Sequence, residues 1–182
     1  RASTLWLGEI SAGATSKDFI GQANWGLGVA VNRQVGALLH SMPFLRPFTG
    51  IIGFLAIVFS HLLRRDLVSA SIHLDSETLE GDYSIILATQ IRHWASGLRF
   101  APQADWYAPV FEVVTIRRCS LVKLIRILLA ARTARHVDFP EVEVHQSRRV
   151  KVSLASAAAV QVDGDILRDV AGELKGLEYR LA

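Results

Sequence analysis

The chain has 182 residues, 51% of them hydrophobic, which is enough for one domain of ordinary size with a substantial core. Twenty Lys and Arg against 17 Asp and Glu give a formal charge of +3, a mild excess that fits either solvated basic faces or contacts with anionic lipid or phosphate. The single cysteine, Cys119, excludes a disulfide within the chain and fits a reducing compartment. No metal-spaced His or Cys cluster and no serine nucleophile elbow occur.

The N-terminal part predicts a hairpin followed by helices. Strand-like residues 4–10 and 18–23 are separated by a turn at 11–16. The segment Asn24 to Gly28 then lies between a strand and a helical stretch, where a backbone can approach a phosphate, although two glycines are a weak signal. Residues 29–65 are predicted to be helical, with breaks at two prolines.

The apolar stretch from Pro47 to Leu63 contains no Asp, Glu, Lys or Arg, so a membrane span has to be considered. It is shorter than the roughly 20 residues that a span needs, and it contains Gly50 and Gly53. We favour a core helix, with a helix that contacts an acyl chain as the second interpretation.

Two strands and a loop are expected in the middle of the chain. Residues 66–75 alternate as in a half-buried strand, and residues 83–89 form a continuous apolar run typical of a buried strand, after a turn at 76–81. The polar and aromatic loop 90–97 follows. Its His93, like the neighbouring Arg92, is more simply a surface or capping group than a catalytic one.

A strand, a helix and a further strand are expected next. Residues 110–116 look like a strand, and leucines and isoleucines at helical spacing predict a helix over 120–135 with Ser120 as its N-cap. The chain returns to a strand at 141–145.

The clearest pattern is at residues 148–165. Alternating residues 149–154 and a second strand through Val160 and Val162 lead directly into Asp163-Gly164-Asp165. Asp-Gly is a strong turn signal at the end of a β run, so two carboxylates are placed at a strand end. From residue chemistry alone, the favoured explanation is a hairpin turn whose aspartates cap backbone amides.

The same stretch, Val-Gln-Val-Asp-Gly-Asp, resembles the closing motif of the diacylglycerol kinase and sphingosine kinase family of lipid kinases, where it is usually Asp-Gly-Glu. Two more stretches resemble family segments in the same order, FIGQANWGLGVAV at 19–31 and SIILATQIRHWASGLRFAPQA at 84–104. The family's Gly-Gly-Asp-Gly-Thr nucleotide loop does not occur in the sequence, so the chain resembles the C-terminal half of such a kinase. It begins at Arg1, and we expect an upstream nucleotide-binding half.

Short strands divided by turns predict a mainly β fold, an antiparallel β-sandwich with two or three packed helices, and the resemblance implies the same fold. No repeat or low-complexity linker divides residues 1–182, which we expect to form a single domain.

The resemblance implies the lipid-substrate half of an ATP-dependent lipid kinase. Asp163 would take the proton of the attacking hydroxyl, and Asp165 stands where relatives carry glutamate. ATP and Mg²⁺ would be bound mainly by the N-terminal half. The other expected partners are a lipid substrate, an anionic membrane surface and a second copy of the chain, with no nucleic acid, and the expected location is cytoplasmic or peripheral at the membrane.

One departure from the family motivates an alternative. Many relatives carry an acidic Asp-Asp-Gly segment that holds a structural magnesium ion, whereas this chain has Trp106 to Glu112 in that place, so no metal site is carried over. Together with the shorter side chain of Asp165, this leaves open a non-catalytic lipid-binding or interaction domain derived from the family. In either case we expect no kinase activity from this chain alone.

Overall fold

The computed structural model describes residues 4–12, 15–29, 41, 67–94, 97–156, 158–167 and 172–180. The predicted helical region 29–65, apart from Val29 and Ser41, lies outside the described residues, and so does the apolar stretch 47–63. No helix within the described ranges is long and apolar enough to cross a membrane.

Eleven strands make up most of the described chain. They are β1 Thr4–Ala12, β2 Thr15–Phe19, β3 Gln22–Gly26, β4 Val68–His73, β5 Thr78–Thr89, β6 Phe111–Arg117, β7 Val142–Ser147, β8 Arg149–Leu154, β9 Val160–Val162, β10 Asp165–Leu167 and β11 Gly172–Arg180. Their pairing is antiparallel throughout, in the order β10-β9-β3-β5-β4-β8-β11-β1-β2, and β6 and β7 continue from β5.

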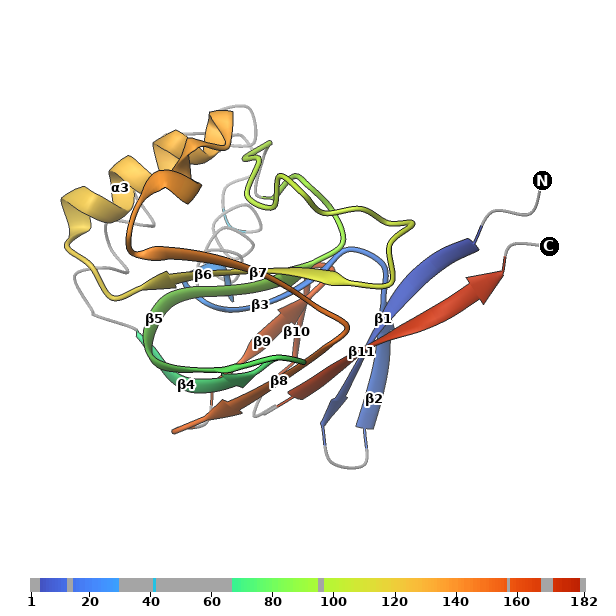
Figure 1. Cartoon of the computed structure of the whole chain (residues 1–182). Helices are drawn as coiled ribbons and strands as arrows, with labels where there is room; N and C mark the ends of the chain where they lie inside the picture. Colours follow the sequence, from blue (N-terminus) through green and yellow to red (C-terminus); the bar gives the residue numbers. More distant parts are fainter. Residues whose placement is uncertain are drawn as a thin grey trace.

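The long strand β5 joins two layers of this arrangement (Figure 1). Residues Thr78 to Tyr83 pair with β4, and residues Ile85 to Thr89 pair with both β3 and β6. The register shifts between Tyr83 and Ile85, at an irregularity of the kind that lets a strand bend from one layer into another. The antiparallel β-sandwich predicted from the sequence is confirmed.

Two apolar cores explain the burial of the strands. One lies between the layers and includes Trp25, Ile72, Ile86 and Val150. The other lies between β5, β6 and β7 on one side and the helix α3, Leu121–Ala130, on the other. β4 therefore alternates buried and exposed residues, because only one of its faces meets a core, whereas the last seven residues of β5 are all buried between two cores.

The helix α3 begins as predicted and ends earlier. Ser120 is its N-cap, and the Ser120 hydroxyl accepts a hydrogen bond from the amide of Lys123. Two 3₁₀ turns, Ala131–Thr133 and Arg135–Asp138, replace the predicted end of the helix. Between them Ala134 has a left-handed φ of 59°, which breaks the helix and places His136 in the interior, where its Nε2 lies 2.9 Å from the carbonyl oxygen of Phe100.

Two strand boundaries predicted from the sequence are wrong. Residues 18–23 are not one strand, because the chain bends at Ile20 and Gly21 and then continues as β3 beside β5 and β9. The turn predicted at 76–81 is shorter, because Thr78 already pairs with His73 at the start of β5. A hairpin is present in the predicted region, formed by β1 and β2, but its turn is shorter than 11–16, because Ser11 pairs with Ser16 and Ala12 with Thr15.

Candidate functional site

The Asp-Gly pair closes a two-residue hairpin between β9 and β10, as the sequence predicts. Asp163 has φ 46° and Gly164 φ 100°, so both residues of the loop adopt positive φ, and Val162 pairs with Asp165 across it. Positive φ at both central positions is the geometry of a type I′ turn, for which Asp-Gly is a preferred sequence. The turn is therefore set by local sequence.

The Asp163 carboxylate binds the backbone of a distant turn. Its Oδ2 accepts the amide of Ile20 at 2.6 Å, its Oδ1 accepts the amide of Gln22 at 2.8 Å, and the amide of Gly21 lies 3.0 and 3.2 Å from Oδ1 and Oδ2. The Asp163 amide in return donates to the carbonyl of Gln22 at 3.0 Å. The aspartate thus caps backbone amides, but those of the bend between β2 and β3, not those of its own turn.

Asp165 has a different environment. Its side chain is 75% exposed and forms an ion pair with Lys17 of β2. The two candidate catalytic carboxylates therefore lie close in sequence but have separate partners, a set of backbone amides for Asp163 and the ammonium group of the half-buried Lys17 for Asp165.

The bend at Gly21 is also fixed from its other side. The carbonyl of Gly21 accepts hydrogen bonds from the amide of Gln90 and from the hydroxyl of Thr89, both at 3.0 Å. A Cβ atom at Gly21 would lie 2.8 Å from Asp163 Oδ1 and 3.2 Å from Ile91 Cδ1. Asp163 and Ile91 therefore lie next to each other over this glycine, at the point where β5 ends.

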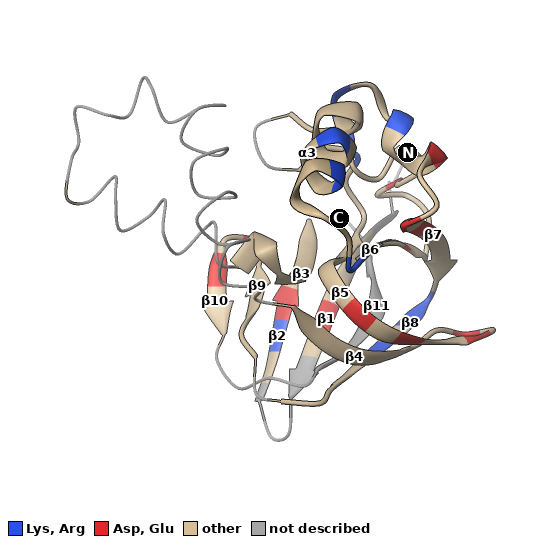
Figure 2. Cartoon of the chain, turned by 90° about the vertical axis from the view of Figure 1, so that its left-hand side faces the viewer, with Lys and Arg blue, Asp and Glu red and all other residues tan. Residues whose placement is uncertain are grey.

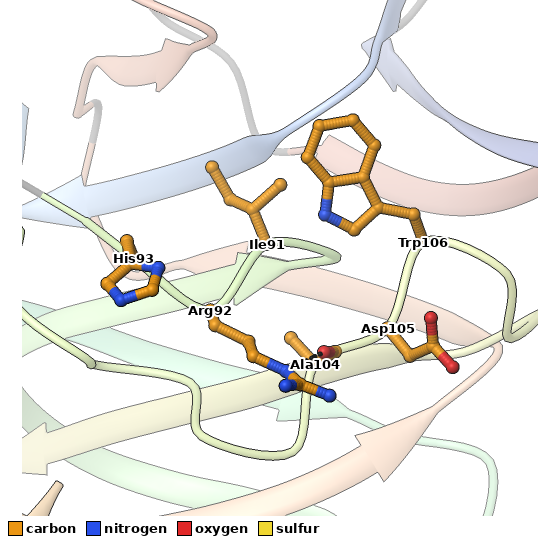
Figure 3. A pocket seen from close by; sticks show the side chains of 6 residues that line it. All are labelled: Ile91, Arg92, His93, Ala104, Asp105 and Trp106. Carbon is orange, nitrogen blue, oxygen red and sulfur yellow. Dashed lines mark hydrogen bonds between the residues drawn. The ribbon is translucent and has the colours of Figure 1, made fainter.

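A pocket of about 380 Å³ begins at Ile91 (Figure 3). Its walls come from two parts of the connection between β5 and β6, and its lining residues are Ile91, Arg92, His93, Ala104, Asp105 and Trp106. The Arg92 side chain extends toward Ala104, and its Nε donates to the Ala104 carbonyl at 3.0 Å. The pocket combines a guanidinium group, an imidazole, a carboxylate and an indole, a mixture suited to a polar group attached to an apolar one.

Glu112 lies buried beside this connection. It is 1% exposed, and burial raises the pKa of its carboxyl group from 4.5 to about 7, against the opposing effects of the Gln103 and Ala104 amides and of the Arg92 charge. No described group makes a well-aligned hydrogen bond to either carboxylate oxygen of Glu112. The Gln103 and Ala104 amides therefore favour the charged carboxylate only by their proximity. The group is therefore poised to be neutral or charged near pH 7.

The described residues do not fit a magnesium–nucleotide site. They contain no group of three or more His, Cys, Asp or Glu that could hold a metal ion, and the oxygens of Asp163 already accept three amides. Nor does the segment Asn24 to Gly28 form a phosphate cradle. A Cβ on Gly28 would lie 2.3 Å from Asn24 Oδ1, and the buried Asn24 amide donates to Gln161 at 3.2 Å. The contacts of this segment are therefore with the protein's own interior.

Several residues of this site were not identified from the sequence. Lys17, the amides of the bend and the pocket-lining Trp106 were not predicted, and Arg92 and His93 were interpreted as surface groups. The sequence contains one further indication of a site. Glu112 lies inside the apolar run 110–116, and a carboxyl group in a buried strand is rare unless it is paired or functional.

These observations define a β-sandwich domain with an acidic hairpin at the end of its sheet. A family model described as the YegS C-terminal NAD kinase beta sandwich-like domain matches residues 24–176. The chain belongs to this family, the C-terminal domain of diacylglycerol kinase-like lipid kinases. The resemblance inferred from the sequence is thereby confirmed.

Solved structures agree in fold. A diacylglycerol kinase from Bacillus anthracis str. Sterne matches with a TM-score of 0.61 at 6% identity, over 97% of this chain and 52% of that one. A second structure from this strain, provisionally named a diacylglycerol kinase, matches with a TM-score of 0.71 at 11% identity, over 97% and 54%. The chain thus spans about half the length of these structures. No curated protein matches the sequence.

Proposed function

We propose that this chain is the lipid-substrate half of an ATP-dependent lipid kinase that phosphorylates a lipid hydroxyl. Membership of the family supports the reaction class, and the observation that carries the assignment is the Asp163 carboxylate, held by three backbone amides at the end of the sheet and next to the pocket. Phosphoryl transfer depends mainly on positioning and charge stabilisation, and a fixed carboxylate near the attacking hydroxyl is a recurrent component.

In this proposal Asp163 accepts the proton of the lipid hydroxyl. The backbone amides of residues 20–22 fix the carboxylate in place, and Asp165 with Lys17 holds the outer side of the hairpin. The pocket beside Ile91 receives the polar headgroup, for which Arg92 offers a cation and Asp105 an acceptor. When bound, Mg-ATP supplies the phosphoryl group, and it is held mainly by an N-terminal nucleotide-binding half.

The proposal includes the setting in which such a reaction occurs. A diacylglycerol or another long-chain alcohol is the substrate class, which places the protein in phospholipid metabolism. Because such lipids reside in bilayers, we infer a cytoplasmic protein that associates peripherally with the membrane, and a homodimer is a compatible assembly.

A second function is favoured by one observation. The oxygens of Asp163 are hydrogen-bonded to backbone amides and Asp165 is paired with Lys17, so both side chains have structural partners without any substrate. A domain that binds lipid without catalysing transfer would keep these contacts, because they join the β9–β10 hairpin to the β2–β3 bend.

Replacement of Asp163 by Asn in the full-length protein separates the two functions. The charge that takes the proton is lost, so turnover with a diacylglycerol or sphingosine acceptor should fall by about two to four orders of magnitude. Asp165→Asn is the matched control, with the same chemical change in the same hairpin, and should lower turnover less. Asp165→Glu, which restores the family's usual residue, should preserve or raise it. Wild-type turnover in the Asp163→Asn enzyme would favour the non-catalytic function of this hairpin.

A further inference from the structure

The outer face of α3 exposes apolar side chains that the fold does not use. Val122 is 69% exposed and Leu129 50% exposed, although both belong to a helix whose opposite face packs Leu124, Ile127 and Leu128 into the core. Residues 122, 126 and 129 are spaced i, i+4 and i+7 and so share one side of the helix, which places Arg126 between the two apolar residues.

Arginines without carboxylate partners surround this stripe. Arg118, Arg126 and Arg132 are exposed, and no described acidic group forms an ion pair with them. Two nearby basic residues do have carboxylate partners: Lys123 pairs with Glu141 at 2.7 Å, and Arg117 pairs with Glu143 at 2.6 Å. Figure 2 shows the basic residues as blue bands along α3, with no red between them.

The combination points to one kind of partner. A solvated helix face needs no exposed Val or Leu, and a surface for nucleic acid needs cations without an apolar stripe. Apolar residues alternating with arginines on one helix face are the pattern of an element that lies in the headgroup region of an anionic bilayer. We propose that the stripe of Val122, Arg126 and Leu129, flanked by Arg118 and Arg132, docks this domain on an anionic lipid surface.

Docking at α3 would also orient the candidate site. The carbonyl of Ala131, just after the helix, accepts the amide of Arg99 at 2.8 Å, and His136 donates from Nε2 to the Phe100 carbonyl at 2.9 Å. Arg99 and Phe100 belong to the connection that carries the pocket residues Arg92 and Asp105. A helix fixed on the bilayer would therefore fix the pocket at a constant height above it.

This inference rests on the peripheral membrane association in the proposed function and assigns a surface to it. Membrane docking at α3 does not depend on phosphoryl transfer. Vesicle binding without nucleotide therefore tests the docking surface, whereas the turnover of Asp163→Asn tests the proposed kinase function. The probes are vesicles of phosphatidylcholine alone and of phosphatidylcholine with 30% phosphatidylserine, and the readout is co-sedimentation of the 182-residue chain at two salt concentrations.

The triple variant R118Q/R126Q/R132Q should bind the phosphatidylserine vesicles on the order of 100-fold more weakly, since each arginine contributes about fivefold. V122Q/L129Q, which keeps the charge and the helix, should weaken binding about tenfold. The matched control is R148Q/R149Q/K151Q, which removes three exposed charges near and in β8 and should change binding less than threefold. When the wild type is bound to these vesicles, the backbone amides of α3, Leu121–Ala130, should exchange hydrogen more slowly than in the free protein.

Three results would overturn the proposal. They are equal binding of the wild type to neutral and anionic vesicles, equal loss in the α3 triple variant and the β8 control, and unchanged binding of V122Q/L129Q. Circular dichroism of each variant is the check that the fold is kept, which we expect because every substituted side chain is exposed.

Discussion

The carboxylate of Asp163 and the amide of Gly21 are in contact across 142 positions of the chain, at 3.0 Å from Oδ1 and 3.2 Å from Oδ2. This contact joins the β9–β10 hairpin to the bend between β2 and β3. The residue proposed as catalytic base is therefore also part of the scaffold, and its two roles can be separated only by measuring stability and turnover on the same variants.

Replacement of Asp163 should reduce stability in proportion to the acceptors that are lost. Asp163→Ala leaves the amides of residues 20–22 without their side-chain partner, and it places alanine, which lacks a polar side chain, at a positive φ. We therefore expect a loss of about 1–3 kcal/mol in the free energy of unfolding. Asn keeps one acceptor oxygen and tolerates the left-handed conformation, so Asp163→Asn should cost less. Urea unfolding measures both.

The control for this prediction is Asp165→Ala, which breaks only the exposed ion pair with Lys17. Exposed pairs contribute about 0–1 kcal/mol, so this variant should unfold at nearly the wild-type urea concentration. An Asp163→Ala protein as stable as Asp165→Ala would show that the three amides are satisfied equally well by water.

Gly21→Ala tests how tightly the carboxylate is held. The new Cβ would lie 2.8 Å from Asp163 Oδ1, and the carboxylate cannot move away without losing hydrogen bonds to the bend. We expect a loss of about 1–3 kcal/mol in the free energy of unfolding. In an Asp163→Ala background the obstructing oxygen is absent, so the same substitution should cost clearly less. Additive losses in this double-mutant cycle would mean that the two residues are not coupled.

The elements predicted best from the sequence are those in which local chemistry and burial agree. Alternation placed β8, the Asp-Gly signal placed the turn at Asp163, and Ser120 marked the start of α3. The bend at Gly21 was missed because its cause is a carboxylate 142 residues away, which no local pattern contains.

The pocket was missed for a related reason. Arg92 and Asp105 are separated in sequence by a loop, and both line the pocket. The Arg92 guanidinium donates to the carbonyl of Ala104, the residue before Asp105, and the buried Glu112 lies beside Ala104 as well. From the sequence each of these charges has an ordinary explanation as a surface group. Their shared location depends on the tertiary path of the β5–β6 connection.

Glu112 should make the stability of this domain depend on pH. Burial raises its pKa from 4.5 to about 7, so the folded protein holds the proton more tightly than the unfolded chain does. The stabilisation is therefore fully present below pH 4.5 and is lost as the pH rises through 7, with a total on the order of 3 kcal/mol. Glu112→Gln is neutral at every pH and nearly the same shape, so relative to it the wild type should become less stable between pH 4.5 and 8.

Urea unfolding of both proteins at pH 4.5, 6, 7 and 8 measures this difference, and the comparison cancels the titration of groups that the two proteins share. Arg92→Gln supplies a second check, because the Arg92 charge opposes the rise in the Glu112 pKa. Without that charge the pKa should rise further, and the loss of stability should extend to higher pH. Parallel stability curves for the wild type and Glu112→Gln would show that the buried carboxyl group does not change its charge in this range, and that another group accounts for any pH dependence.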